Sequence, residues 1–205
     1  MVKNYIWSVR RRDFLLVTLT LLLSFLAQSA SASDLRIWDQ LQGTSPKGYV
    51  LLLRHAYAPG VGDPENFRLN DCSTQRILSD LGRQDARDVG EWLKRRQIDI
   101  LRVESSRWCR AKETAELLGL GRVKLNKNLD SLFEENDIAN HPQTLQIRKQ
   151  IIAHRKKSGL LIMVGHYVNI AALTGVGVAS GEGVLVRANR NGELRVLGAT
   201  PALGR

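Results

Sequence analysis

Residues 48–56 read Gly-Tyr-Val-Leu-Leu-Leu-Arg-His-Ala, and the expected architecture is built outward from this stretch. The apolar run from Tyr49 to Leu53 is continuous, which is typical of a strand buried on both faces of a parallel sheet. Arg54 and His55 follow it directly. We therefore expect a central strand whose carboxyl end presents an arginine and a histidine.

Amphipathic segments alternate with short apolar runs after this strand. Ser79 can cap a helix in which Ala86, Val89 and Leu93 recur at three and four residues. The same reasoning gives helices at 79–96, 110–118, 142–157 and 167–175, and strands at 98–103 and 160–164. Strands that alternate with helices predict a mostly parallel sheet with helices on both faces.

The C-terminal segment has a different pattern. Two runs of strand character, 184–189 and 193–197, flank Asn191-Gly192, which predicts a two-residue hairpin. The expected fold class is therefore α/β: a three-layer α/β/α sandwich with a mostly parallel sheet and an antiparallel C-terminal edge hairpin.

The N-terminal segment has the composition of an export signal. A basic region is followed by an apolar run at 14–26 and by Ala-Ser-Ala at 30–32. The run of about 13 residues is shorter than the roughly 20 that span a bilayer, so cleavage after Ala32 is favoured over an uncleaved anchor. We expect a signal peptide at 1–32 and a single domain at 33–205, located in the periplasm or secreted.

The export route is left open by the sequence. Residues 11–15, Arg-Arg-Asp-Phe-Leu, resemble the twin-arginine pattern, whereas the leucine-rich run that follows suits the general secretory route equally. Either route implies transient contact with an export machinery.

The charge of the expected mature chain favours anionic ligands. It has 26 basic and 19 acidic residues, a net charge of about +7. The basic residues are scattered and are not interleaved with stacking aromatic residues, so nucleic acid is not an expected partner. The oligomeric state cannot be predicted from the sequence.

Three polar clusters come directly after apolar runs, at 54–55, 105–110 and 165–166. In a parallel sheet, ligands bind beyond the carboxyl ends of the strands. A fold that places these strands side by side would bring two histidines and at least one arginine into one pocket. A phosphate group would fit that combination.

These clusters resemble the motifs of a known family. Residues 54–56 (R-H-A) resemble an R-H-G motif, and 105–115 (S-S-R-W-C-R-A-K-E-T-A) resemble S-S-x-x-x-R-A-x-x-T-A. Residues 164–166 (V-G-H) and 78–83 (L-S-D-L-G-R) resemble two further motifs. The chain therefore resembles the histidine phosphatase (phosphoglycerate-mutase-like) superfamily over most of 48–197. Alanine at position 56, where the family has glycine, is a departure.

The resemblance implies a role for each matching residue. His55 would be the nucleophile and form a phosphohistidine that water hydrolyses. Arg54 and Arg110 would bind the phosphoryl oxygens, and their charge would keep His55 unprotonated. His166 would stabilise the transition state by a hydrogen bond. This chemistry requires no cofactor and no metal.

Two further assignments follow from the family pattern. The family often supplies a general acid in an L-x-E motif, which Leu132-Phe133-Glu134 matches, with Glu135 and Asp137 alongside. Arg107 is expected to contact the substrate's leaving group or solvent, because the phosphate arginine is the one directly before Ala111.

Cys72 and Cys109 are the two cysteines of the chain. In an exported protein we expect them to form a disulfide that ties the loop after the first strand to the pocket. The alternatives are two buried thiols, or a zinc site with His55 and His166, although their spacing matches no compact ligand pattern.

The expected activity is hydrolysis of a phosphomonoester outside the cytoplasm. The size, the exported start and the R-H-A variant resemble the periplasmic branch of the family, which includes phosphatases proposed to act on lipopolysaccharide core heptose. The expected substrate is a phosphorylated small molecule or glycan, such as a sugar phosphate or an envelope glycan phosphate. The alternative is a non-catalytic phosphate- or phosphoglycan-binding protein on the same fold.

Overall fold

The computed structural model describes residues 36–200. The expected signal peptide, its cleavage site and the twin-arginine pattern lie outside the described residues. Within residues 36–200, no helix is both long enough and apolar enough to cross a membrane.

A six-stranded sheet forms the centre of the fold, in the order β3-β2-β4-β1-β5-β6. Its strands are β1 (Tyr49–Arg54), β2 (Ile100–Ser105), β3 (Val123–Leu125), β4 (Leu160–Gly165), β5 (Gly183–Ala188) and β6 (Leu194–Ala199). The first four in this spatial order are parallel, whereas β5 and β6 pair antiparallel. The predicted α/β class, with its mostly parallel sheet and antiparallel C-terminal hairpin, is confirmed.

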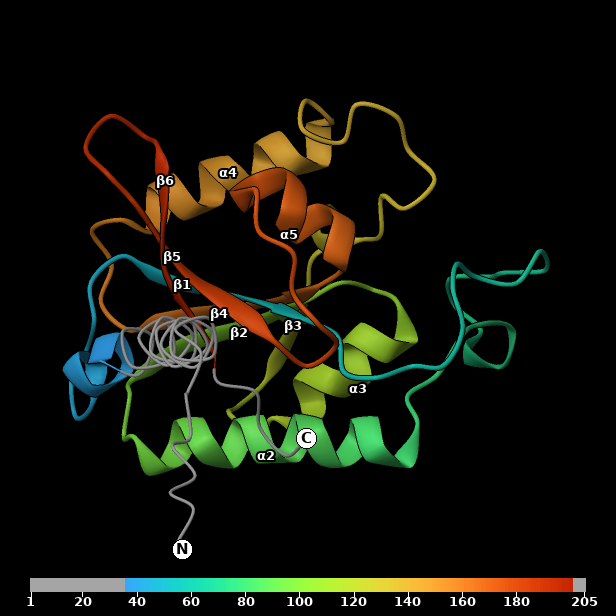
Figure 1. Ribbon diagram of the computed structural model, residues 1–205, viewed down its shortest axis with the longest axis horizontal. Helices are drawn as coiled ribbons and strands as arrows, with labels where there is room; N and C mark the ends of the chain where they lie inside the picture. Colours follow the sequence, from blue (N-terminus) through green and yellow to red (C-terminus); the bar gives the residue numbers. More distant parts are fainter. Residues whose placement is uncertain (1–35, 201–205) are drawn as a thin grey trace, which may run out of the picture.

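Helices cover both faces of the sheet, as Figure 1 shows. They are α2 (Asp80–Arg95), α3 (Cys109–Leu117), α4 (Pro142–His154) and α5 (Tyr167–Thr174), with a further helix at 36–41 and the 3-10 turns η1 (Cys72–Thr74) and η2 (Lys127–Leu129). Alternate β1 residues supply the two cores. Leu51 and Leu53 pack with α2 and α3, whereas Val50 and Leu52 pack with α4 and α5. A strand buried on both faces explains the continuous apolar run.

The C-terminal hairpin differs from its prediction in the turn. Asn189 donates its backbone N–H to the Glu193 carbonyl at 2.9 Å, so three residues, 190–192, form the loop. Gly192 has a φ of +84°. This left-handed residue closes a three-residue loop, and the expected two-residue turn was wrong.

Other boundaries shift by a few residues. The second strand begins at Ile100, two residues after its expected start, and α4 ends at His154, before the expected 157. The short edge strand β3 and the two 3-10 turns were not predicted, because each is only three residues long.

Helix α2 holds the segment that follows β1. Ser79 caps the helix, since its Oγ accepts a hydrogen bond from the Gly82 backbone N–H at 3.0 Å, and its own N–H binds the Tyr57 carbonyl. A Cβ at Gly82 would lie 2.2 Å from that carbonyl oxygen. Only glycine therefore allows the helix to approach the backbone two residues beyond His55.

Candidate active site

The strand register brings the two predicted histidines together. Arg54 on β1 pairs with Gly165 on β4, and the His55 backbone N–H donates to the Gly165 carbonyl at 2.9 Å. The His55 and His166 rings lie edge to face with centroids 5.4 Å apart. Both are buried, with exposed fractions of 4% and 3%.

The hydrogen bonds of His55 define its tautomer. Nδ1 lies 2.8 Å from the Ala56 carbonyl oxygen, which can only accept, so Nδ1 carries the proton. Arg110 donates from Nε to His55 Nε2 at 3.3 Å, so Nε2 presents its lone pair. Burial lowers the pKa of His55 to about 3, aided by the charges of Arg110 and Arg54 and opposed by the Ala56 carbonyl. The imidazole is therefore neutral, with the lone pair of Nε2 facing the Arg110 guanidinium.

His166 connects to a buried carboxylate through a serine. Its Nε2 lies 3.0 Å from Ser106 Oγ, and that hydroxyl donates to Asp130 Oδ1 at 3.3 Å. Burial, reinforced by the charges of nearby cationic side chains, holds the pKa of His166 well below its ordinary value. The second histidine is also neutral.

The Asp63 carboxylate binds the guanidinium of Arg110, a contact that the sequence did not predict. Arg110 Nη1 and Nη2 donate to the two Asp63 carboxylate oxygens at 2.6 and 3.1 Å, and Trp108 Nε1 donates to Oδ2 at 2.8 Å. Burial opposes ionisation of Asp63, but these hydrogen bonds outweigh it and lower the pKa of the carboxyl. The Asp63 carboxylate thus binds Arg110 in the bidentate arrangement that a phosphate group would also adopt.

Arg76 holds the Asp63 loop in place. Its Nη1 donates to the carbonyls of Ala58 at 2.7 Å and Gly60 at 2.8 Å, and its Nε donates to the Gly62 carbonyl. These carbonyls belong to the Gly- and Pro-rich stretch after β1. Arg76 was also missed by the sequence reasoning.

A cavity of about 140 Å³ lies between these groups. Its charged and histidine lining residues are Arg54, His55, Asp63, Arg76, Arg110 and His166. Arg54 reaches it from the end of β1, where its Nη1 donates to the Val178 carbonyl at 3.0 Å and its guanidinium lies over the Tyr167 ring. Four of the five predicted catalytic and phosphate-binding residues therefore line one pocket.

Glu134 and Arg107 lie outside this pocket. Glu134 is exposed and lines a neighbouring cavity of about 620 Å³, which shares Asp63, Ser131 and Phe133 with the pocket. Arg107 pairs with Asp130, with Nε 2.7 Å from Oδ2. Arg107 therefore orders the carboxylate behind Ser106 and His166 in this structure.

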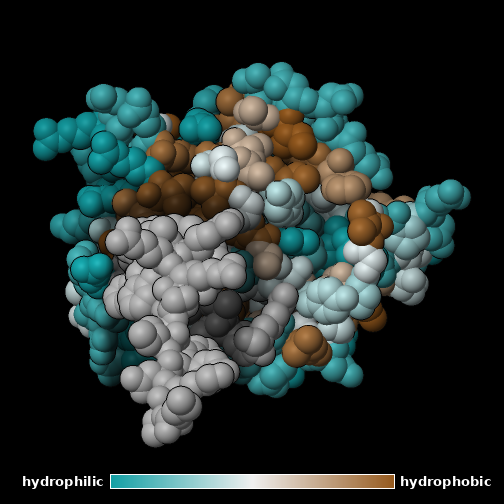
Figure 2. All heavy atoms as spheres, viewed as in Figure 1, coloured by the Kyte–Doolittle hydropathy of each residue, from teal (hydrophilic) through white to brown (hydrophobic). Residues whose placement is uncertain are grey.

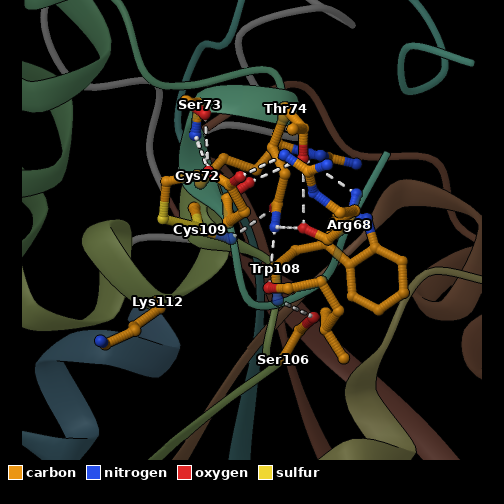
Figure 3. Close-up of a disulfide and its surroundings, with 12 residues drawn as sticks. Arg68, Cys72, Ser73, Thr74, Ser106, Trp108, Cys109 and Lys112 are labelled. Carbon is orange, nitrogen blue, oxygen red and sulfur yellow. Dashed lines mark hydrogen bonds and ion pairs between the residues drawn. A yellow bond between two sulfur atoms is a disulfide. The ribbon is translucent and has the colours of Figure 1, made fainter. Parts of the chain in front are cut away.

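The predicted disulfide is confirmed. Cys72 and Cys109 are bonded, with an S–S distance of 2.01 Å and Cα atoms 5.7 Å apart, and Figure 3 shows the bridge between η1 and the start of α3. The Cys109 backbone N–H also donates to Gln75 Oε1 at 3.0 Å. The bridge therefore fixes the loop at the residue next to Arg110.

Because Cys72 and Cys109 form the disulfide, neither offers a thiolate to the zinc site considered above as an alternative. Within the described residues, no group of three or more His, Cys, Asp and Glu side chains is arranged to hold a metal ion.

The sequence model of the histidine phosphatase superfamily, branch 1, matches residues 50–157, which include His55 and Arg110. The chain belongs to this superfamily. It is thus a phosphatase of the histidine type, and the predicted family is confirmed. No curated protein sequence matches the chain significantly.

Solved structures of several phosphatases share the fold. The chain is similar to protein histidine phosphatase SixA complexed with tungstate, with a TM-score of 0.55 at 16% identity, covering 74% of this chain and 96% of that one. It is similar to a putative alpha-ribazole-5'-P phosphatase from Escherichia coli, with a TM-score of 0.56 at 16% identity over 78% and 100% of the two chains. It is also similar to phosphoserine phosphatase from Entamoeba histolytica in complex with 3-phosphoglyceric acid, with a TM-score of 0.55 at 14% identity, covering 76% of this chain and 98% of that one.

The residues that the sequence reasoning missed share one property. Asp63, Arg76 and Asp130 each act through a partner far along the chain, so no local periodicity marks them. One signal was available for Asp63: it is the first charged residue after His55, in a stretch otherwise made of small and apolar residues and one tyrosine.

Proposed function

We propose that this protein is an exported phosphomonoester hydrolase that works through a phosphohistidine on His55. The observation that carries the proposal is the unprotonated Nε2 of His55 beside the buried guanidinium of Arg110. A neutral nucleophile next to a fixed cationic fork is what attack on a phosphoryl group requires.

Substrate binding would begin with an exchange of partners on Arg110. The phosphoryl dianion displaces the Asp63 carboxylate from the guanidinium and also meets Arg54 and Arg76. His55 Nε2 then donates its lone pair to phosphorus, and the bond from phosphorus to the leaving oxygen breaks. In the second step water attacks phosphorus, the N–P bond breaks and inorganic phosphate leaves with the water's oxygen.

The general acid has two candidates, Glu134 and Asp63. Glu134 lies in the neighbouring cavity, whereas Asp63 lies in the pocket itself. When phosphate takes Arg110, Asp63 loses its cationic partner and faces a dianion, and both changes raise the pKa of its carboxyl. Asp63 would then hold a proton near the leaving oxygen, and we favour it for this role.

His166 would support the transferring group. In the structure the Ser106 hydroxyl donates to Asp130, so the single proton of the neutral His166 ring lies on Nε2 and is donated to Ser106 Oγ. Turning the hydroxyl from Asp130 to Nε2 would move this proton to Nδ1, from which it could be donated to a phosphoryl oxygen. Asp130, which is itself paired with Arg107, accepts the hydrogen bond of the Ser106 hydroxyl and fixes the serine beside His166. Preorganised donors of this kind stabilise the charge that develops in the transition state.

The shape of the site favours a sugar phosphate or phosphorylated glycan. The pocket of about 140 Å³ has room for a phosphoryl group, and the adjoining cavity of about 620 Å³ has room for the rest of the substrate. That cavity combines the rings of Phe67 and Trp108 with the carboxylates of Glu65, Glu134 and Glu135. Carboxylates accept hydrogen bonds from hydroxyl groups, and aromatic rings offer apolar faces to a sugar.

Export rests on the N-terminal sequence and is consistent with the disulfide, because disulfides persist in oxidising compartments. N-terminal sequencing of the envelope fraction should find Ser33 as the first residue. Replacing Arg11 and Arg12 together by lysine should block export by the twin-arginine route. Unchanged export would assign the general secretory route.

Hydrolysis of p-nitrophenyl phosphate by the purified mature protein tests the central proposal. His55→Ala should abolish turnover, whereas Arg110→Ala and His166→Ala should leave a residual activity. Acid-labile phosphoenzyme should be trapped on the wild type. Phosphoenzyme formed equally on His55→Ala would refute the nucleophile. Phosphate binding without turnover between pH 4 and 8 would instead establish a binding protein.

A further inference from the structure

A second cationic cleft lies at the other end of the sheet. It has a volume of about 750 Å³, and its lining includes Arg155, Lys156, Arg187, Arg190 and Arg195. The β5–β6 hairpin supplies three of these side chains, and the segment after α4 supplies two. In Figure 2 the projecting part at the upper left, over the hairpin turn, is hydrophilic.

This cleft is remote from the phosphatase pocket. Tyr49, at the start of β1, pairs with Arg187, whereas Leu53, next to the pocket, pairs with Gly183. A six-residue strand spans roughly 20 Å, and Figure 1 places the hairpin turn and the loop between β1 and α2 at opposite ends of the molecule. One small phosphate ester cannot occupy both sites.

No carboxylate among residues 36–200 neutralises the charges of the cleft, because none of the five basic side chains makes an ion pair within this part of the chain. Arg155 donates to the Asn189 carbonyl at 3.2 Å, and Arg187 lies over the Tyr49 ring at 5.2 Å. Glu193, the acid of the hairpin turn, accepts a hydrogen bond from Asn189 Nδ2.

Two of the arginines lie opposite each other across the β5–β6 pair. Arg187 and Arg195 are cross-strand partners in the β5–β6 register, and both are exposed. Like charges placed directly opposite each other destabilise an antiparallel pair. An anion seated between the two guanidinium groups would remove that repulsion.

We propose that this cleft is a second anion-binding site that takes a soluble ligand with two or more phosphate groups. Five cationic side chains exceed the charge of one phosphate, and the volume lies in the range of small-molecule sites. Arginine forks bind phosphate oxygens in pairs. The cleft tethers such a ligand without hydrolysing it, because it has no histidine or acid in its lining.

Calorimetric titration with methylenediphosphonate tests the proposal, because its P–C–P bridge resists hydrolysis. The test variant is Arg187→Gln/Arg195→Gln. The matched control is Arg122→Gln/Lys124→Gln, which removes two exposed charges near β3, at the other edge of the sheet. Hydrolysis of p-nitrophenyl phosphate and its inhibition by methylenediphosphonate report the phosphatase pocket separately.

The wild type should show a site that the test variant binds at least tenfold more weakly, with hydrolysis and its inhibition unchanged. The control should stay within twofold of the wild type, and Arg190→Gln alone should give an intermediate loss. An equal loss in the control, or no second site in the wild type, would overturn the proposal. Arginine-dependent binding to phosphatidylglycerol vesicles without methylenediphosphonate binding would overturn it in favour of a membrane surface.

Discussion

The protonation of His55 is set by its immediate neighbours. The ring is buried among Arg54, Arg76 and Arg110, and its pKa falls to about 3. In the unfolded chain the pKa returns to about 6.5. Below pH 6.5 the unfolded chain binds a proton that the folded chain does not. The free energy of unfolding therefore falls as the pH drops from about 6.5 toward 3.

Replacing His55 by asparagine should remove this dependence. Between pH 7 and pH 4.5, the wild type should lose about 2 to 3 kcal/mol more unfolding free energy than His55→Asn. Urea unfolding at the two pH values measures the difference. Equal losses in both proteins would mean that His55 is protonated in the folded state.

A second residue-scale prediction separates the two acids. Asp63→Asn should lower turnover of an alkyl phosphate, a poor leaving group, by about 100-fold, and turnover of p-nitrophenyl phosphate much less. Inorganic phosphate should inhibit this variant more strongly, because the carboxylate that competes for Arg110 has lost its charge.

Glu134→Gln is the comparison for Asp63→Asn, since it removes an exposed carboxylate of the neighbouring cavity. It should change both rates by less than about threefold. If Glu134→Gln, and not Asp63→Asn, lowers turnover of the alkyl phosphate far more than turnover of p-nitrophenyl phosphate, then Asp63 is not the general acid.

At the scale of the element, α2 controls the position of the segment after β1, which begins with the proposed nucleophile His55. A methyl group at Gly82 would meet the Tyr57 carbonyl at 2.2 Å. Gly82→Ala should therefore cost about 1 to 3 kcal/mol of stability and lower kcat, because the shift of Tyr57 is passed to His55. Urea unfolding and steady-state kinetics measure the two effects.

The exposed helix position Gln84 supplies the control for Gly82. Gln84→Ala should change stability by no more than about 0.5 kcal/mol and leave kcat unchanged. Wild-type kinetics in Gly82→Ala would show that α2 does not position His55.

Elements were predictable from the sequence where local pattern determines them. A few consecutive residues suffice to predict three features: the buried run of β1, the Ser79 cap of α2 and the left-handed Gly175 that ends α5. The hairpin turn was wrong, because Asn191-Gly192 fits a two-residue turn locally and only the β5–β6 register selects three residues. Asp63 and Arg110 meet across 47 positions, which no local pattern reports.

At the scale of the whole molecule, the disulfide joins a surface loop to the pocket. In the chain-entropy model, closing a loop of this length contributes about 3 to 4 kcal/mol to stability. Cys72→Ser/Cys109→Ser should therefore melt at a lower temperature. It should also bind phosphate more weakly, because Cys109 precedes Arg110.

Thiol titration of the exported wild type under denaturing, non-reducing conditions is the companion measurement. It should detect no free thiol, and reduction should reproduce the properties of the double variant. Two titratable thiols in freshly purified protein would contradict the bridge.

The pairing of β1 with β4 also governs when the pocket can form during folding. Arg54 and Gly165 are partners although they lie 111 positions apart in the chain. Contacts of such separation require closure of a long loop and form slowly compared with helices. The pairing of β1 with β4, which brings His55 beside His166, is therefore expected to form late in folding. Hydrolysis should therefore return only after most of the helical content on refolding, and a chain cut before residue 160 would be inert.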